Sequence, residues 1–259
     1  MKYSYKEMPE QMKGTFGDIS RSFGFSWKEF VMTIPSPMFL VTTYKSNGKP
    51  NACMQSWATF TSADHGNGFY AILASVNKNG HLYKSLQETG QAVINFFSAD
   101  HHAACMDTIK NNQFDTDEIT ASGLTVAKAS WVNAPMVEEC FMNLECKLAW
   151  EKEIVPGDDH VIICLEIIGA HIDEDHLADR TGDNGLLYNI HHPINPEKVG
   201  KTAHDYAGVL QKIIDVMEYE AKLRKQIGSY ASKRPWGAVN MSFYDPDNNV
   251  IYFRQLQEE

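Results

Sequence analysis

A polar loop after an apolar run carries the residues best suited to binding chemistry. The run FYAILASV ends in Ser75-Val76, and Asn77, Lys78 and His81 follow shortly after it. Small polar groups and one lysine at the end of a strand can hold the phosphate of a flat aromatic cofactor, and a helix that starts near His81 adds main-chain donors. The competing interpretation is a solvated loop, because SVNKNG is ordinary turn composition.

Alternating strand-like segments position this loop. The Asn47-Gly48 pair is a strong hairpin signal between the first two of them, and Gly90 is a natural left-handed end for a helix. The elements predicted here are, in chain order, a short helix over 26–32, strands over 38–45, 50–61 and 69–76, a helix over 81–88 and a strand over 91–97.

The second half of the chain continues the pattern and then changes. A helix is predicted over 99–111, and two long strands over 136–155 and 160–173 are joined by the turn at Pro156-Gly157. Many strands with frequent turns and few long helices favour a barrel or sandwich, so the fold class is mainly β with flanking helices. Apolar residues at helical spacing predict a helix over 205–228, and two strand-like runs over 239–244 and 250–253 form a hairpin extension.

Composition excludes several classes of function. The chain has 259 residues and a formal net charge of −10, which argues against nucleic acid and anionic membrane partners. No apolar run approaches the roughly 20 residues of a membrane helix, and the N-terminal residues have no apolar signal segment. The five cysteines form no CxxC pair, which favours reduced thiols and a cytoplasmic location.

Two pairs of adjacent histidines, His101-His102 and His191-His192, invite a metal interpretation. Neighbouring residues on a strand or helix point in different directions, and neither pair has a carboxylate or cysteine at ligand spacing. We therefore expect no metal site.

Five segments in a characteristic order resemble the flavin reductase-like, FMN-binding split-barrel family, including flavoredoxin-type proteins. They cover roughly residues 30 to 195 and read PSPMFLVTTYKSNGKPNACMQSW, ASVNKNGHLYKSLQETGQAVINFF, SGLT, NAPMVEECFMNLEC and GDDHVIICLEI. The resemblance implies a split β-barrel over residues 34–200, preceded by a lead over 1–33 and followed by an extension over 201–259. It also implies a homodimer whose second subunit helps to close the flavin site.

The resemblance assigns roles to residues of this chain. Asn51 would hydrogen-bond the flavin ring edge and Trp57 would wall its dimethylbenzene end. The residues alone favour a turn cap and a core tryptophan, and the resemblance favours the flavin roles. His160, after Gly157-Asp158-Asp159, would steer an acceptor or donate a proton and is the catalytic candidate. The implied cofactor-binding set is Asn51, Ala52, Ser56, Trp57, Ser75, Val76, Asn77, Lys78, His81, Asn95, Phe96 and Lys128. Phe96 is also a core candidate, and Lys128 is also explained as a surface lysine.

The implied function is an FMN-dependent oxidoreductase that moves electrons between NAD(P)H, bound flavin and an acceptor. Lys78 stands where relatives often carry arginine. The lysine would replace the bidentate phosphate contact of an arginine by a point charge. One alternative is an FMN electron carrier without an NAD(P)H site. The absence of a GxGxxG fingerprint does not separate the two, because reductases of this fold do not need one. Another is a non-catalytic barrel that binds flavin or haem.

Overall fold

The computed structural model divides the chain into two units, residues 1–211 and 212–259. Helix α2 (Trp27–Met32) confirms the short helix predicted near the N-terminus, and the Oγ of Ser26 accepts the Lys28 N–H at 3.3 Å, as a serine cap does. The residues that the structure describes are 4–10, 26–32, 34–178, 185–190, 207–210, 230–233, 239–244 and 250–255.

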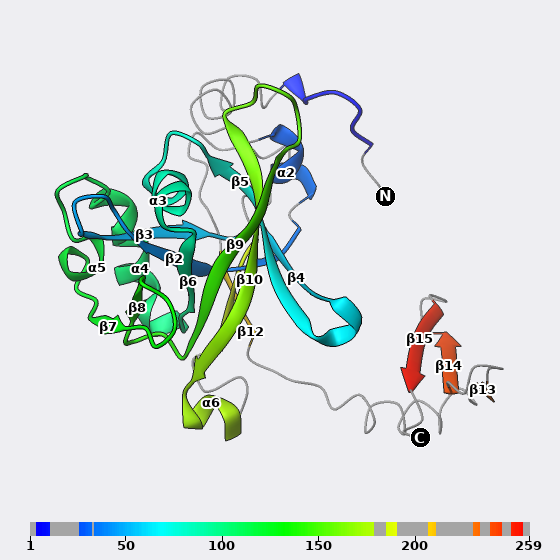
Figure 1. Ribbon diagram of the computed structural model, residues 1–259. Helices are drawn as coiled ribbons and strands as arrows, with labels where there is room; N and C mark the ends of the chain where they lie inside the picture. The colour runs from blue at the N-terminus through cyan, green and yellow to red at the C-terminus, as the bar shows by residue number, and fades with distance from the viewer. Residues whose placement is uncertain are drawn as a thin grey trace. The chain divides into compact units, whose positions relative to one another are not determined.

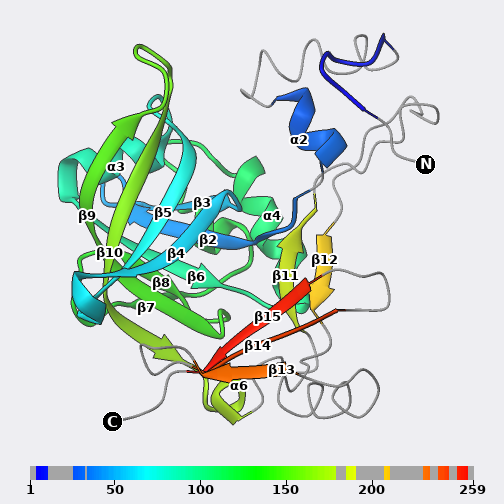
Figure 2. The same ribbon diagram turned by 90° about the vertical axis from the view of Figure 1, so that its right-hand side faces the viewer.

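The main sheet of the larger unit closes into a barrel (Figures 1 and 2). Its seven antiparallel strands run in the order β3-β2-β6-β9-β10-β5-β4. Their bounds are β2 (Phe39–Tyr44), β3 (Pro50–Gln55), β4 (Ala58–Ala63), β5 (Gly68–Asn77), β6 (Gln91–Phe96), β9 (Met142–Glu153) and β10 (His160–Ile172). Only Ser56 and Trp57 separate β3 from β4, which lie at opposite ends of this order. The sheet must therefore curl until its two edge strands come together at this junction, which confirms the mainly-β barrel.

The single strand predicted over 50–61 is wrong, because the chain changes its partner strand in the middle of that run. β3 pairs with β2 as far as Gln55, and from Ala58 the chain pairs with β5. Between them, the carbonyl of Trp57 accepts the Ala74 N–H at 2.8 Å, which fixes the crossing. No glycine or proline marks this exchange, so composition alone does not reveal it.

Aromatic and aliphatic side chains fill the barrel. The rings of Phe39, Phe60 and Phe96 lie with centroids 5.3 to 6.1 Å apart. Helix α3 (His81–Thr89) packs Leu82 and Leu86 into the same core, and it ends at Gly90 with a left-handed φ of 63°, as predicted. The chain thus returns from β5 to β6 through a helix held on the barrel.

A second apolar layer lies between the barrel and two helices, α4 (His102–Lys110) and α5 (Glu118–Ala121). Leu40 and Ala52 from β2 and β3 are buried there against Cys105 of α4 and Ile119 of α5. The helix predicted over 99–111 is confirmed, with its first turn formed by the 3₁₀ helix η3 (Ala99–His101). This layer holds the start of α5 beside strand β3.

Short elements complete the larger unit. β7 (Val126–Lys128) pairs with β8 (Pro135–Val137), helix α6 (Glu174–Ala178) follows β10, and β1 (Ser36–Pro37), β11 (Leu186–Asn189) and β12 (Ala207–Leu210) form a sheet in that order. The predicted helix over 205–228 is wrong at β12, because these four residues pair with β11. The other residues of that prediction lie outside the described residues.

The smaller unit contains an antiparallel sheet in the order β13-β14-β15. Strands β14 (Val239–Tyr244) and β15 (Val250–Gln255) confirm the two runs predicted to form a hairpin. Strand β13 (Tyr230–Lys233) was not predicted, since its four residues carry no alternating pattern.

A fully buried carboxylate anchors the loop between β7 and β8. Glu145 of β9 accepts the N–H groups of Ser130 and Trp131, each at 2.6 Å, and of Val132 at 2.8 Å. Its Oε1 lies 2.7 Å from Nε2 of His171. Burial opposes ionisation, yet the hydrogen bonds from His171 and the three amides hold the pKa of Glu145 below its usual value.

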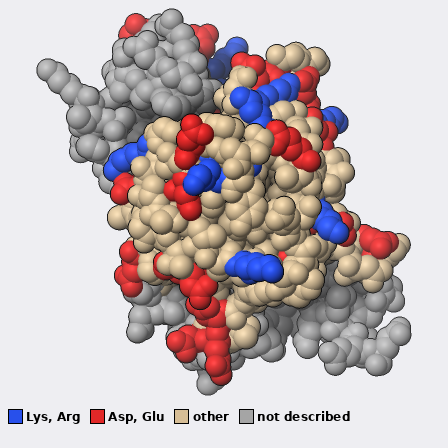
Figure 3. Space-filling model, turned by 60° about the vertical axis from the view of Figure 1, so that its left-hand side comes forward, with Lys and Arg blue, Asp and Glu red and all other residues tan. Residues whose placement is uncertain are grey.

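On the face drawn in Figure 3, lysines and acidic residues are interspersed rather than gathered by sign. None of the described helices has both the length and the hydropathy to span a bilayer. The described part of the chain shows no cluster of three metal-ligand side chains. Four of the five free cysteines are buried, Cys53 being partly exposed.

Glu145→Gln should destabilise the larger unit by about 2–3 kcal/mol, because the new NH₂ group faces backbone donors. Since the folded-state pKa is lowered, the carboxylate stabilises fully above its unfolded value, and this contribution is lost as the pH falls through the folded pKa. Urea unfolding in a pH series should therefore show the largest difference from the native protein near neutral pH. The control is Glu166→Gln, which changes an exposed glutamate of β10. Equal stability at neutral pH would contradict this role.

Candidate functional site

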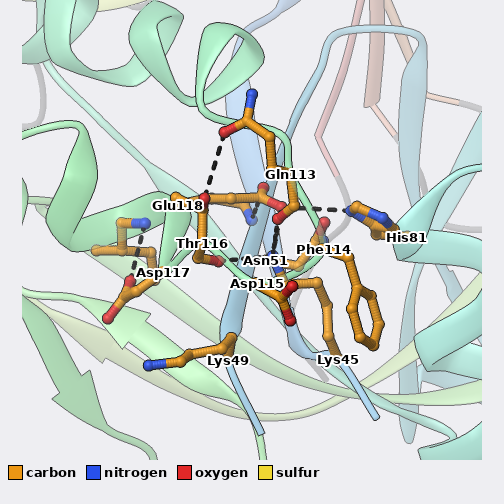
Figure 4. A network of polar contacts seen from close by, with 12 residues as sticks. Lys45, Lys49, Asn51, His81, Gln113, Phe114, Asp115, Thr116, Asp117 and Glu118 are labelled. Atoms are coloured by element: carbon orange, nitrogen blue, oxygen red, sulfur yellow. Dashed lines mark hydrogen bonds and ion pairs between the residues drawn. The ribbon is translucent and has the colours of Figure 1, made fainter. Parts of the chain in front are cut away.

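A buried ion pair joins the end of β2 to the start of α5. Nζ of Lys45 is 2.9 Å from Oε1 of Glu118, and both side chains are 1% exposed. The same ammonium donates to the carbonyl oxygens of Gln113 at 2.8 Å and Thr116 at 2.7 Å. All three ammonium hydrogens are therefore used, and Figure 4 shows these partners gathered around the lysine.

Glu118 connects this ion pair to predicted site residues. Its Oε2 accepts the Ala52 N–H at 2.9 Å, and its Oε1 lies 3.4 Å from Nδ1 of His81, the first residue of α3. Asn51, which precedes Ala52 on β3, is buried and donates to Oγ1 of Thr43 at 3.3 Å. The carboxylate thus brings strand β3 and the N-terminus of α3 to one point (Figure 4).

The start of α3 offers main-chain donors. Gly80 occupies the N-cap position, and no side chain caps the helix. The ring of Phe114 contacts that of His81 edge-on, with centroids 6.1 Å apart. The N–H groups of a first helical turn have no partner inside the helix, and the helix dipole adds positive potential there, so this end suits an anion.

The loop before α3 begins with an irregularity in β5. Pairing between β5 and β10 shifts register there, and Ser75 is exposed with a left-handed φ of 57°. Val76 points into the barrel core, whereas Asn77 is exposed and its Oδ1 accepts the Asn79 N–H at 2.8 Å. A non-glycine residue rarely adopts this φ, so the bulge is a strained position at the end of the strand.

The structure pairs Lys78 with acidic neighbours. Its Nζ contacts Oε1 of Glu153 and donates to the carbonyl oxygen of Asp158 at 2.7 Å. The hydrogen bond with Glu153 raises the pKa of Lys78 and lowers that of the carboxylate. The ammonium is thus shared with the β9–β10 hairpin before any ligand arrives.

His160 lies beside the same loop. Its Nε2 is 3.5 Å from Nδ2 of Asn77, and its Nδ1 is 3.4 Å from Oδ1 of Asp158. The backbone N–H of His160 donates to the same Oδ1 at 3.0 Å, and this bond lowers the pKa of Asp158. Four predicted residues, Ser75, Asn77, Lys78 and His160, therefore gather where β5 and β9 end and β10 begins.

The junction between β3 and β4 adjoins this bulge. Trp57, half-buried, accepts through its carbonyl from the N–H of Ala74, the residue just before Ser75. Ser56 is buried, and its Oγ accepts from Nδ2 of Asn189 at 3.2 Å. The predicted ring-wall tryptophan and the predicted phosphate loop are thus neighbours in space.

Three predicted site residues make their contacts away from the β5 loop and the start of α3. Asn95 is fully buried, donates to Oγ1 of Thr42 at 2.9 Å and accepts from Nδ2 of Asn143 at 2.9 Å. Phe96 belongs to the barrel core, and Lys128 is exposed at the end of β7. The asparagine is therefore engaged in holding strands together.

Sequence reasoning missed the three charged residues that organise the site, namely Lys45, Glu118 and Glu153. Lys45 ends an apolar run, and Glu118 lies in the polar stretch DTDEIT. Their partners are 73 and 75 residues away in the chain. A lysine ending a strand is ordinarily exposed, so no local signal marks this one as buried.

The outer edge of β3 provides a further set of polar groups. β3 ends the strand order, so alternate N–H and C=O groups point away from β2. The Ala52 N–H is one of these, because it donates to Glu118, and Met54 lies two residues further along the same edge. An open edge of this kind can hydrogen-bond the polar rim of a flat ring.

Lys45→Ala should cost about 3–5 kcal/mol of stability, because it leaves Glu118 buried without its cation and two carbonyls without a donor. The control is Lys49→Ala, since Lys49 is exposed on the same hairpin. Thermal or urea unfolding of both variants measures the difference. Similar unfolding curves for the two would show that the buried pair contributes little.

The family model for a flavin reductase like domain matches residues 31–192. The chain resembles the solved flavoredoxin of Desulfovibrio vulgaris (Miyazaki F) with 23% identity and a TM-score of 0.54, covering 71% of this chain and 93% of that one. It resembles nitrilotriacetate monooxygenase component B from Bacillus cereus with 16% identity and a TM-score of 0.60, covering 83% and 99%. A flavoredoxin from Methanosarcina acetivorans shows 20% identity and a TM-score of 0.52, covering 73% and 92%.

The search among curated proteins found no match. The structural likenesses lie below 25% identity and concern the fold, whereas the family model spans more than half of the chain. It includes every strand of the barrel and the helix that carries His81. The protein belongs to the flavin reductase-like family.

Proposed function

We propose that the protein binds FMN along β3, the bulge of β5 and the start of α3, and uses it to move electrons from NAD(P)H to an acceptor. The observation that carries this proposal is the family match over residues 31–192, within which all three elements lie. Their donors suit the parts of this cofactor. Bound FMN would supply the chemistry of accepting a hydride and passing electrons on.

The phosphate would bind at the start of α3. The uncapped first turn supplies N–H donors, and His81 and Ser75 add a ring nitrogen and a hydroxyl nearby. Lys78 would add charge if it exchanged Glu153 for the phosphate. The acidic neighbours of this lysine make the helix start the principal anion site.

The ring would lie along the outer edge of β3. Main-chain groups near Met54 and Ser56 would hydrogen-bond its polar rim, and Trp57 would cover its apolar end. Asn51 and Ala52 would position this edge of β3, because the Asn51 side chain is bound to Thr43 and the Ala52 N–H to Glu118. A second copy of the chain would cover the open face, as the family resemblance implies.

His160 would act at the other end of the loop. Asp158 and Asn77 orient its two ring nitrogens, so the imidazole can hold a proton toward an incoming acceptor or orient the nicotinamide. Hydride transfer itself requires no acid from the protein. We therefore assign His160 to positioning and proton supply.

A second candidate is an FMN electron carrier without an NAD(P)H site. Two structural neighbours are flavoredoxins. Such a carrier would bind FMN at the same surface and receive electrons from another protein.

FMN titration of the purified full chain should give saturable binding, followed by flavin fluorescence. Adding NADH and NADPH separately without oxygen should then bleach the flavin absorbance with at least one donor. Bleaching with neither, while binding persists, would favour the carrier. Failure of FMN to bind would contradict both.

The pair of Lys78 and Glu153 provides a sharper test. Lys78→Ala should weaken FMN binding by about 1–3 kcal/mol if the ammonium reaches the phosphate. Glu153→Gln should tighten it, because it releases Lys78 from its partner. Lys110→Ala and Asp107→Asn are matched controls, since these residues form an exposed ion pair on α4. Unchanged affinity in both test variants would leave the phosphate to α3 alone.

A further inference from the structure

An apolar cavity of about 470 Å³ lies at the end of the barrel near α6. Barrel strands, the segment before β2, and β11 all contribute to its wall. It is open to solvent on one side, because Phe69, Ala170 and Ile172 of its wall are exposed, and concave apolar clefts with few polar groups are the usual form of small-molecule sites. A cavity of this size is therefore a candidate ligand site.

Aromatic rings dominate the wall. Phe60 contacts Phe96 and Phe69, with centroids 5.7 and 6.4 Å apart, and the latter pair is stacked at 29°. Phe141 stacks on His176 of α6 with centroids 4.3 Å apart and the planes at 27°. These faces and edges suit another flat ring, because aromatic pairs prefer offset-stacked and edge-to-face contacts.

The wall also limits the charge and size of the ligand. Among the described residues, His176 and Tyr188 are the polar side chains of the wall, and none that lines it is a lysine, arginine, aspartate or glutamate. A phosphate or carboxylate that bound against this wall would lose part of its water without gaining a charged partner. Apolar cavities of about 150 Å³ bind benzene, so this cavity has room for about two or three fused rings.

We propose that this cavity binds an uncharged, flat aromatic molecule of two or three rings that carries at most a hydroxyl group. Phe96 is the one residue that both lines the cavity and was predicted to contact flavin. The site is otherwise distinct from β3, the β5 bulge and α3. The proposal therefore stands or falls separately from FMN binding.

Calorimetric titration of the full chain with 2-naphthol tests this site. The ion 2-naphthoate serves as a charged analogue of the same size. Ala170 of β10 lines the cavity, so Ala170→Trp should fill it, and Ala170→Leu does so with a smaller side chain. Ile168→Trp is the matched control on the same strand, because Ile168 is exposed and does not line the cavity. Circular dichroism checks the fold of each variant.

We expect saturable binding of 2-naphthol that is at least tenfold weaker in folded Ala170→Trp or Ala170→Leu and unchanged in Ile168→Trp. 2-Naphthoate should bind at least tenfold more weakly than 2-naphthol, and saturating FMN should leave 2-naphthol affinity within twofold. Absence of 2-naphthol binding would overturn the proposal. A segment of the chain that fills the cavity would give this result. So would native affinity in both Ala170 variants, equal binding of 2-naphthoate, or displacement by FMN.

Discussion

The carboxylate of Glu118 is the interaction on which the arrangement of the site depends. It is almost fully buried, and it meets Lys45, the Ala52 N–H and the His81 ring from three different elements. A buried charge is tolerated only where its partners are fixed, so the carboxylate fixes them in turn. The edge of β3 and the start of α3 keep their spacing because both contact the same group.

Much of the barrel follows from local patterns in the sequence. Asn47-Gly48 and Gly90 mark a hairpin and a helix end, and strand β10 is visible as an apolar run. The single strand predicted over 136–155 is wrong, because a turn divides that run into β8 and β9. The exchange of partner strands at Ser56 and Trp57 is not visible in the sequence, because both halves of that run look like one strand. Strand β12 was predicted as part of a helix, because four residues are too few to separate helical from strand spacing.

The sequence identified site residues whose roles depend on neighbours in the chain better than those whose roles depend on distant partners. Asn77 and His160 were named from turn composition and family resemblance, and the structure places their side chains together. Asn95 was also named, yet its amide is engaged by Thr42 and Asn143 inside the protein. The partner of Lys78 could not be anticipated, since Glu153 lies on a hairpin distant in the chain. Pairing across the fold, rather than residue type, decides which polar groups can face a ligand.

The two-residue junction between β3 and β4 also constrains which changes of chain length the protein can accommodate. Ser56 and Trp57 span the seam where the first and last strands of the sheet meet, so their number sets how closely the circumference can be drawn together. An insertion there would let the edges drift apart. Extra residues at the exposed β4–β5 turn would only lengthen a surface loop, whereas the β9–β10 turn holds Lys78 and His160 and has less freedom. We expect natural length variation among relatives to collect at the β4–β5 turn and to avoid the seam.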